Sequence, residues 1–201
     1  MTRSLIAAAF VSLDGVMQAP GGLEEDPSGG FEHGGWVFPF WDGTIEEGMA
    51  PLFSGPLDLL LGRRTYDMWA GHWPSREDDP IGGAYNRAAK YVVTSRGGPL
   101  SWSNSHAVAN GLDGVAQVKA QDGPDIQMWG SSTLYPGLIE RGLIDRLYLM
   151  TFPVLLGAGK RLFEAMPSRT LRLIDSRTSS KGVVIATYEP AGPVQTGSFA
   201  T

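Results

Sequence analysis

The sequence repeats one local pattern, in which a short apolar run ends at glycine or small polar residues and helical periodicity follows. The apolar runs cover residues 57–61, 90–94 and 126–129. Each run is bounded by turn residues, which is typical of a short strand buried on both faces. Strands that alternate with helices favour an α/β domain whose sheet is parallel at its centre.

Further strands at both ends of the chain complete this sheet. Residues 5–12 form a nearly continuous apolar run before an Asp-Gly pair at 14–15, as expected for a central strand. Residues 144–155, 170–174 and 183–189 indicate strands with no helix between them, which favours an antiparallel edge. We therefore expect a mixed, mostly parallel sheet that ends in an antiparallel C-terminal hairpin.

Amphipathic segments between these strands are predicted to be helices. Thr44 and Glu47 have the spacing of a capping box, which places the start of the first helix at Thr44. Gly142 stands where a left-handed residue would end the last helix. The expected helices cover residues 44–53, 63–69, 81–89, 113–121 and 133–141.

The length of 201 residues favours one domain, since a domain takes roughly 150 residues. We assign residues 1–190 to this domain and expect the aperiodic tail 191–201 to be mobile. Residues 18–41 form an insertion rich in glycine and aromatic residues. We expect the insertion to fold back over an apolar surface, because a solvated linker would not carry so many aromatic side chains. They are Phe31, Trp36, Phe38, Phe40 and Trp41.

Composition excludes several classes of function. The chain has no cysteine, which excludes disulfides, thiolate metal sites and cysteine nucleophiles and leaves the cytoplasm as the default location. The net charge of −5 argues against a nucleic-acid partner. The apolar run at the N-terminus is too short to span a membrane. His33, His72 and His106 lack the spacing of metal ligands, so we expect no metal site.

Small, hydroxyl and basic residues follow three of the predicted strands. In an open α/β sheet, ligands bind beyond the carboxyl ends of the strands, where helix N-termini present backbone N–H groups. Arginines at this edge of a net-acidic protein indicate a phosphorylated ligand. Taken singly, the segments also fit a surface arginine pair, a polar turn and a serine N-cap. They are Gly62-Arg63-Arg64-Thr65, Thr94-Ser95-Arg96 and Gly130-Ser131-Ser132-Thr133.

Motifs of other nucleotide sites and of hydrolases are incomplete or absent from the sequence. Gly157-Ala158-Gly159 begins like a dinucleotide-binding turn, but Leu162 occupies the sixth position and the strand before it is expected in the antiparallel part. The sequence also contains no P-loop and no G-x-S-x-G motif. The strand ends are therefore the best candidate site.

In their order along the chain, these segments resemble the dihydrofolate-reductase-like superfamily. They are most similar to its branch that includes the reductase domain of bacterial riboflavin biosynthesis. The resemblance runs from about Arg3 to Glu189. It implies a three-layer fold with a mostly parallel sheet, an NADPH site and a homodimer. Beyond the strand ends, it rests on Ser12-Leu13-Asp14-Gly15, Tyr66, Trp129, Leu134, residues 153–159 and Leu162-Phe163.

The resemblance implies coenzyme contacts for the residues at the strand ends. Arg63, next to Gly62, would lie near the 2′-phosphate of NADPH, with Arg64 and Thr65 at the pyrophosphate. Ser95 and Arg96, which follow Thr94, would lie beside the adenine ribose and its 2′-phosphate. Ser131 stands where related reductases have a second glycine. The loop under the pyrophosphate and the nicotinamide ribose would consist of Gly130, Ser131, Ser132, Thr133 and Leu134.

The resemblance also implies residues on the substrate side. Asp14 matches an acid that the riboflavin branch places near the substrate and the nicotinamide, where it would orient the substrate or relay a proton. An Asp-Gly turn explains Asp14 without any chemistry. His33 and Trp36 in the insertion would stack on a planar substrate. A hydrophobic plug or a dimer contact explains them equally well.

We therefore expect an NADPH-dependent reductase that transfers a hydride to a C=N or C=O bond of a small heterocyclic substrate, pteridine-like or pyrimidine-like. Folate itself is a doubtful substrate, because a long insertion precedes Glu46 and Glu47 and capping explains Glu47. The alternative is a non-catalytic nucleotide-binding or flavin-binding module of the same fold. A structural protein that uses the Trp-rich loop is a third hypothesis.

Overall fold

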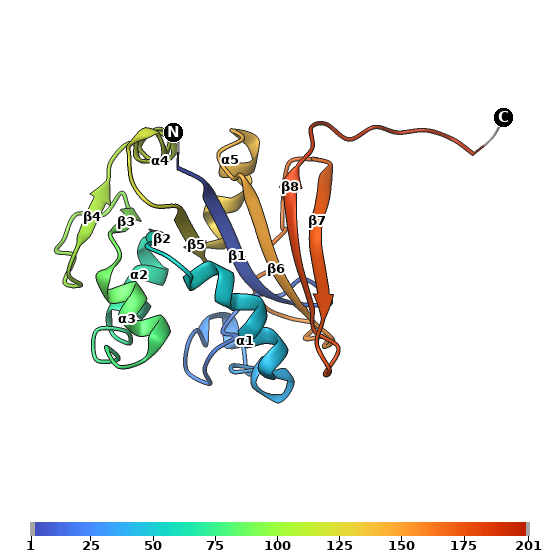
Figure 1. Cartoon of the computed structure of the whole chain (residues 1–201), viewed down its shortest axis with the longest axis horizontal. Coiled ribbons are helices and arrows are strands. Elements are labelled where there is room, and N and C mark those ends of the chain that lie inside the picture. The colour runs from blue at the N-terminus through green and yellow to red at the C-terminus, as the bar shows by residue number, and fades with distance from the viewer. Residues whose placement is uncertain (1–2, 200–201) are drawn as a thin grey trace.

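The computed structural model describes residues 3–199, which form a sheet in the strand order β4-β3-β2-β5-β1-β6-β8-β7 (Figure 1). From β4 to β6 in this order, neighbouring strands are parallel, whereas β8 is antiparallel to β6 and β7. The predicted mixed sheet with an antiparallel C-terminal hairpin is therefore confirmed. The strands are β1 Leu5–Ser12, β2 Asp58–Gly62, β3 Lys90–Val93, β4 Ser105–Val108, β5 Ile126–Trp129, β6 Arg146–Phe152, β7 Leu171–Thr178 and β8 Val184–Pro190.

Strand β1 lies in the middle of the sheet because it is apolar on both faces. Successive side chains of a strand point to opposite faces. Ala8 accordingly joins one apolar cluster, whereas Leu5, Ala7 and Ala9 join a second cluster across the sheet. The alanines of this strand are small, so helices can pack closely on both faces of the sheet.

Helices cover both faces of the sheet and produce the expected three layers. Helices α1, α2 and α3 contribute Ile45, Tyr66 and Tyr85 to the first cluster, and α4 and α5 contribute Val115 and Leu138 to the second. The helices are α1 Gly43–Met49, α2 Arg63–Ala70, α3 Pro80–Arg87, α4 Leu112–Ala120 and α5 Tyr135–Glu140. Short 3-10 helices are η1 Ser28–Gly30, η2 Phe38–Phe40, η3 Ala50–Phe53 and η4 Ser132–Leu134.

The start and the end of the first predicted helix differ from the expectation. Asp42 is the N-cap of α1, and its carboxylate accepts hydrogen bonds from the N–H groups of Thr44 at 3.0 Å and Ile45 at 3.2 Å. The capping box predicted at Thr44 is therefore wrong. The expected single helix over 44–53 also divides into α1 and η3, where Pro51 lacks the N–H that a continuous helix needs.

Two strands differ from the sequence-based expectation because they carry little buried apolar surface. Strand β4 was not predicted, and within it only Val108 is buried. Strand β7 extends beyond the predicted range 170–174 to Thr178, and each of its residues is exposed. Periodicity detects burial, so it misses strands that bury little. Gly142 has a φ of +63° after α5, as its predicted C-cap role requires.

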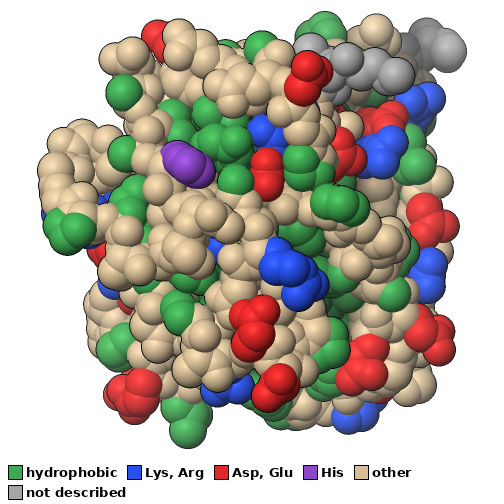
Figure 2. All heavy atoms as spheres, turned by 60° about the vertical axis from the view of Figure 1, so that its left-hand side comes forward, with side chains coloured by type: hydrophobic (Ala, Val, Ile, Leu, Met, Phe, Trp, Pro, Cys, Tyr) green, Lys and Arg blue, Asp and Glu red, His purple; other side chains and the backbone are tan. Residues whose placement is uncertain are grey.

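On the face that Figure 2 shows, basic side chains are scattered among acidic ones and form no large patch of a single charge. An anion that binds on this face would therefore depend on individual arginines rather than on a broad basic patch. Within residues 3–199, no helix combines the length and the apolar character that a membrane span requires.

Candidate functional site

The sheet places two of the predicted strand-end segments in direct contact. β2 and β5 are parallel neighbours, so their carboxyl ends meet at the same edge. The Ser131 Oγ accepts a hydrogen bond from the Gly62 N–H at 2.8 Å and donates one to the Thr65 Oγ1 at 3.0 Å. Ser131 holds a left-handed conformation with φ +59°, next to Gly130 with φ +66°. The loop after β5 therefore lies against the first turn of α2.

The first turn of α2 combines backbone donors with two arginines that point to different partners. Helix α2 begins directly after β2, and no side chain caps its N-terminus. The Arg63 Nε donates to both carboxylate oxygens of Asp67, at 2.8 and 3.1 Å. The Arg63 Nη1 is buried and has no hydrogen-bond partner among the described residues. An orphaned buried donor costs about 1–3 kcal/mol, so this nitrogen is a candidate ligand contact.

The loop after β3 lies beside Arg63 and leaves its polar side chains exposed. A Cβ at Gly98 would lie 3.9 Å from the Arg63 Nη1, which shows how closely this loop approaches the guanidinium. The Thr94 Oγ1 accepts from the Arg96 N–H at 3.0 Å and shapes the turn. Ser95 and Arg96 are exposed. Strand order β3-β2-β5 therefore brings all three predicted segments to one edge of the sheet.

The insertion covers the neighbouring ends of β1 and β6. The ring of Trp36 meets Phe152 of β6 edge-on at 5.3 Å between centroids, and Trp41 meets Phe10 of β1 at 5.9 Å. Trp36 is buried, and its indole N–H donates to the Gln18 carbonyl at 2.8 Å. Among the alternatives for Trp36, a hydrophobic plug fits this position. His33 is exposed and touches Phe31. The substrate contacts predicted for both residues stay predictions.

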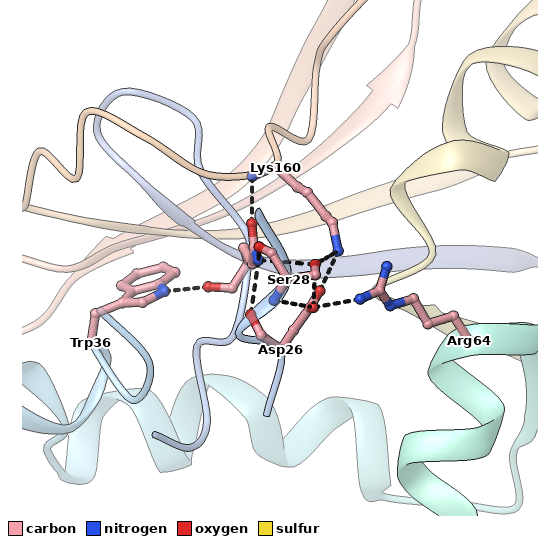
Figure 3. A network of polar contacts seen from close by, with 6 residues as sticks. Asp26, Ser28, Trp36, Arg64 and Lys160 are labelled. Atoms are coloured by element: carbon pink, nitrogen blue, oxygen red, sulfur yellow. Dashed lines mark hydrogen bonds and ion pairs between the residues drawn. The ribbon is translucent and has the colours of Figure 1, made fainter. Parts of the chain in front are cut away.

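A buried carboxylate, Asp26, fastens the insertion to the rest of the site (Figure 3). Its Oδ1 accepts from the Ser28 hydroxyl at 2.6 Å and from the Arg64 Nη2 at 2.7 Å. Its Oδ2 accepts from the Lys160 Nζ, which also donates to the Ser28 Oγ at 2.8 Å. Burial works to raise the pKa of Asp26, but the hydrogen bonds from Lys160 and Ser28 and the Lys160 charge together lower it. We call Asp26, Ser28, Arg64 and Lys160 the latch.

Gln18 supports the latch through its side-chain amide. The Nε2 donates to the carbonyls of Asp26 at 2.8 Å and Ser28 at 2.9 Å, and the Oε1 accepts from the Lys160 N–H at 2.9 Å. Sequence reasoning did not identify Gln18, Asp26 or Lys160 as site residues. Asp26 and Lys160 lie 134 positions apart, so no local spacing could pair them.

Asp14 lies in the Asp-Gly turn after β1 and is saturated with hydrogen bonds. Its carboxylate accepts from the Ser12 hydroxyl at 2.6 Å and from the N–H groups of Leu156 at 3.1 Å and Gly157 at 2.8 Å. Chiefly because of the Ser12 hydrogen bond, the pKa of Asp14 is lowered to about 2. Asp14 is therefore ionised at neutral pH and ties β1 to the segment after β6. Its role toward a substrate stays a prediction.

The segment after β6 packs tightly under the insertion at Gly159. This glycine has φ +119°, and a Cβ there would lie 2.7 Å from the Val16 Cγ1 and 2.9 Å from the Phe31 Cε2. Only glycine combines this backbone conformation with so close an approach. Gly159 therefore serves packing and turn geometry.

The chain is similar to several known proteins over nearly its full length. It is 28% identical to the uncharacterized protein YyaP of Bacillus subtilis over 196 residues, which cover 92% of this chain and 94% of YyaP. A putative riboflavin biosynthesis protein of Shewanella sp. PV-4 matches with a TM-score of 0.65 and 21% identity, over 94% of this chain and 99% of the other. Dihydrofolate reductase of Enterococcus faecalis, solved in complex with NADP(H) and RAB-propyl, matches with a TM-score of 0.60 and 14% identity, over 94% of this chain and 99% of the other.

The two solved structures confirm the fold that the resemblance implies. Both solved structures are less than 25% identical to the chain, so they establish the shared fold. A sequence model of the RibD C-terminal domain matches residues 3–185. Family and neighbours together point to a reductase of the dihydrofolate-reductase kind. The chain belongs to the RibD C-terminal domain family.

Proposed function

We propose that the chain is an NADPH-dependent reductase that transfers a hydride to a C=N or C=O bond of a small pteridine-like or pyrimidine-like heterocycle. The observation that carries this proposal is the buried Arg63 Nη1, which lacks a partner among the described residues and lies beside an uncapped helix N-terminus. A phosphate group would satisfy both features, since it accepts hydrogen bonds from a guanidinium and from helix N–H groups.

The residues at the strand ends fit the phosphates of NADPH. Arg63, together with the exposed Ser95 and Arg96, would hold the 2′-phosphate. The first-turn N–H groups of α2, with Thr65, would hold the pyrophosphate. The loop Gly130–Leu134 would lie under the pyrophosphate and the nicotinamide ribose. The Ser131 hydroxyl would not contact the coenzyme directly, because it is already hydrogen-bonded to the Gly62 N–H and the Thr65 Oγ1.

The proposed reaction requires the chain to position the coenzyme and the substrate and to exclude water. It does not require a covalent bond between the protein and the substrate. Bound NADPH supplies the hydride, so no protein nucleophile is required. The aromatic residues of the insertion would exclude water from the ends of β1 and β6. Asp14, ionised at neutral pH, would orient a donor group of the heterocycle rather than deliver a proton.

Calorimetric titration with NADPH and NADH at one moderate salt concentration tests the coenzyme. We expect NADPH to bind with micromolar or lower Kd and NADH to bind much more weakly. The double variant Arg63→Ala/Arg96→Ala should lose about 1.5–3 kcal/mol of NADPH binding per charged hydrogen bond and leave NADH unchanged. Arg141→Ala, which removes an exposed arginine paired with Asp113, is the matched control. Failure to saturate with either coenzyme would refute the proposal.

The non-catalytic alternative is favoured by one observation, the complete internal pairing of Asp14 and Asp26 beside the expected substrate position. Oxidation of NADPH in the presence of pterins, flavins, deazaflavins or ribosylamino-pyrimidines separates the two hypotheses. Turnover with any of them supports the reductase. Tight NADPH binding with no oxidation across this panel supports a binding module.

A further inference from the structure

A buried lysine, Lys90, begins β3 and is not part of the candidate site. Its side chain is fully buried. The Nζ donates to the carbonyl of Asn86 at 2.8 Å and to that of Ala88 at 2.9 Å, at the end of α3. The same nitrogen lies 4.4 Å from the centre of the Trp102 ring. Two carbonyls and one aromatic face therefore surround the ammonium group.

Stability alone does not explain a lysine in this position. Burial lowers the pKa of Lys90 to about 8, although the charges of Glu77 and Asp58 work to raise it, so the side chain is mostly a cation at pH 7. The removal of a charge from water costs free energy, which an apolar side chain of the same size would avoid. A buried cation is, however, attracted strongly to the face of a tryptophan ring. The contact with Trp102 is therefore the feature that a lysine provides and an apolar residue would not.

Trp102 joins three elements through its ring and its N–H groups. It is buried in the segment 94–104 between β3 and β4, which we call the β3–β4 loop. Its backbone N–H donates to the Tyr66 Oη of α2, and its indole N–H donates to the Asn86 Oδ1 of α3, each at 2.8 Å. Figure 1 shows β3, β4, α2 and α3 together at one end of the sheet. Trp102 thus ties the β3–β4 loop to β3, α2 and α3.

The β3–β4 loop runs alongside the first turn of α2. Gly98 lies beside Arg63, where a Cβ on Gly98 would be 3.9 Å from the Arg63 Nη1. Trp102 contacts Tyr66, which follows Arg63 by three positions and lies on the same face of the helix. These two contacts are about one helical turn apart. The position of Trp102 therefore determines where the loop, which also carries Arg96, passes Arg63.

We propose that Lys90 and Trp102 are positioning residues that hold the β3–β4 loop against α2 and thereby set the spacing between Arg63 and Arg96. This inference rests on the proposed function, in which the two arginines hold the 2′-phosphate of NADPH. NADH lacks this phosphate, so the spacing affects one coenzyme and not the other. Lys90 is fully buried and contributes to the selection of NADPH without contacting it.

Calorimetric titration of two conservative variants tests the inference. Lys90→Met keeps an unbranched side chain and removes the ammonium group. Tyr66→Phe keeps the ring and removes the Oη that accepts from the Trp102 N–H. Each variant should weaken NADPH binding by about tenfold, the effect of roughly one lost hydrogen bond, and leave the Kd for NADH within about twofold of the wild type. A general loss of structure would weaken both coenzymes, so the ratio of the two Kd values is the measurement.

The control is Lys119→Met, because Lys119 lies on α4 and its Nζ pairs with Asp145 at 2.7 Å. This variant should change neither Kd. Trp102→Phe keeps an aromatic face for the Lys90 Nζ and should retain most of the preference for NADPH. Trp102→Leu removes this face and should reduce the preference as much as Lys90→Met does. If Lys90→Met does not fold, Tyr66→Phe and Trp102→Leu provide the same comparison.

Hydrogen exchange of the backbone amides in residues 95–103, measured without coenzyme, separates this inference from the proposed function. Lys90→Met and Tyr66→Phe should speed the exchange by about tenfold, whereas Lys119→Met should leave it unchanged. A wild type that binds neither coenzyme refutes the proposed function and the selection of NADPH with it, but faster exchange in the two variants still supports the anchoring of the loop. Unchanged exchange in both variants would overturn the inference. So would equal weakening of NADPH and NADH, or wild-type affinity of both variants for NADPH.

Discussion

The side of the sheet that holds the carboxyl ends of the parallel strands has two halves, and the polar groups of each half find their partners in a different way. At β1 and β6, Asp14 and Asp26 are fully paired within the chain, and the aromatic insertion closes over the strand ends. At β2, β3 and β5, the Arg63 Nη1 has no partner among residues 3–199, α2 has no side-chain cap, and Arg96 is exposed. The closed half is stabilised by its own contacts, whereas the open half has donors left for a ligand.

The largest effect should come from Gly159→Ala in the closed half. The new Cβ would collide with Val16 and Phe31, and the residue would have to keep a φ of +119°. Overpacking and backbone strain each cost about 1–3 kcal/mol, so we expect a loss of about 3 kcal/mol in the free energy of unfolding. Urea denaturation measures it.

Gly157→Ala is a control of the same type for this change. Gly157 has φ +75°, but nothing lies within 4 Å of the position that its Cβ would take. We expect a loss of about 1 kcal/mol from the backbone alone. Equal losses for the two variants would show that the insertion is not packed tightly against Gly159.

The next prediction distinguishes the role of Arg63 from that of Arg64, the two adjacent arginines of α2. Arg63→Ala should weaken NADPH binding by about 1.5–3 kcal/mol and hardly change stability, because the hydrogen bonds that its side chain makes within the described residues go to Asp67, whose side chain is 53% exposed. Arg64 is held by Asp26, so Arg64→Ala should have the smaller effect on the coenzyme and should loosen the insertion. Calorimetry and limited proteolysis measure these two effects. The reverse ranking in calorimetry would place the coenzyme phosphate on the latch.

The sequence predicts the open half of this edge better than the closed half. Gly62 ends β2, and Thr94 and Gly130 directly follow β3 and β5. These strands are parallel and lie in the order β3-β2-β5, so local strand signals place the three residues at one edge. No comparable signal exists for the latch, in which Asp26 meets Lys160 across 134 positions. Burial of Trp36 likewise depends on how the insertion returns to β6, which its glycine-rich sequence does not specify.

A similar limit applies to the elements themselves. Strands β1 and β5 were located because their apolar side chains are buried on both faces. The start of α1 was misplaced because Asp42 and Thr44 are both good capping residues two positions apart, and the direction of the incoming chain decides between them. Sequence periodicity thus predicts which segments are buried, but it does not predict the direction in which the chain enters a helix.

A smaller effect is expected for Asp26→Asn, which keeps the shape of the latch and removes its charge. Asp26 is buried and faces two cations, but Arg64 and Lys160 are both partly exposed, so water compensates for part of the loss. We expect destabilisation of about 2 kcal/mol, less than for a fully buried pair. Asp113→Asn, which removes an exposed pair with Arg141, should cost below about 1 kcal/mol in the same denaturation assay. Equal costs would mean that the latch contributes no more than a surface pair.

The smallest effect, on the order of 1 kcal/mol after screening by solvent, is the contribution of Asp14 to the pH dependence of stability. Its pKa falls from 3.8 to about 2 on folding, so the carboxylate stabilises the folded state above pH 4. This stability is lost as the pH falls through about 2, because the unfolded chain takes up the proton first. Asp14→Asn should therefore remove stability at pH 5 and little of it below pH 2. Ser12→Ala, which deletes the main hydrogen bond that lowers this pKa, should move the loss to higher pH. If NADPH oxidation by the wild type instead shows an ionisation near neutral pH that Asp14→Asn removes, Asp14 transfers a proton and the closed half takes part in the chemistry.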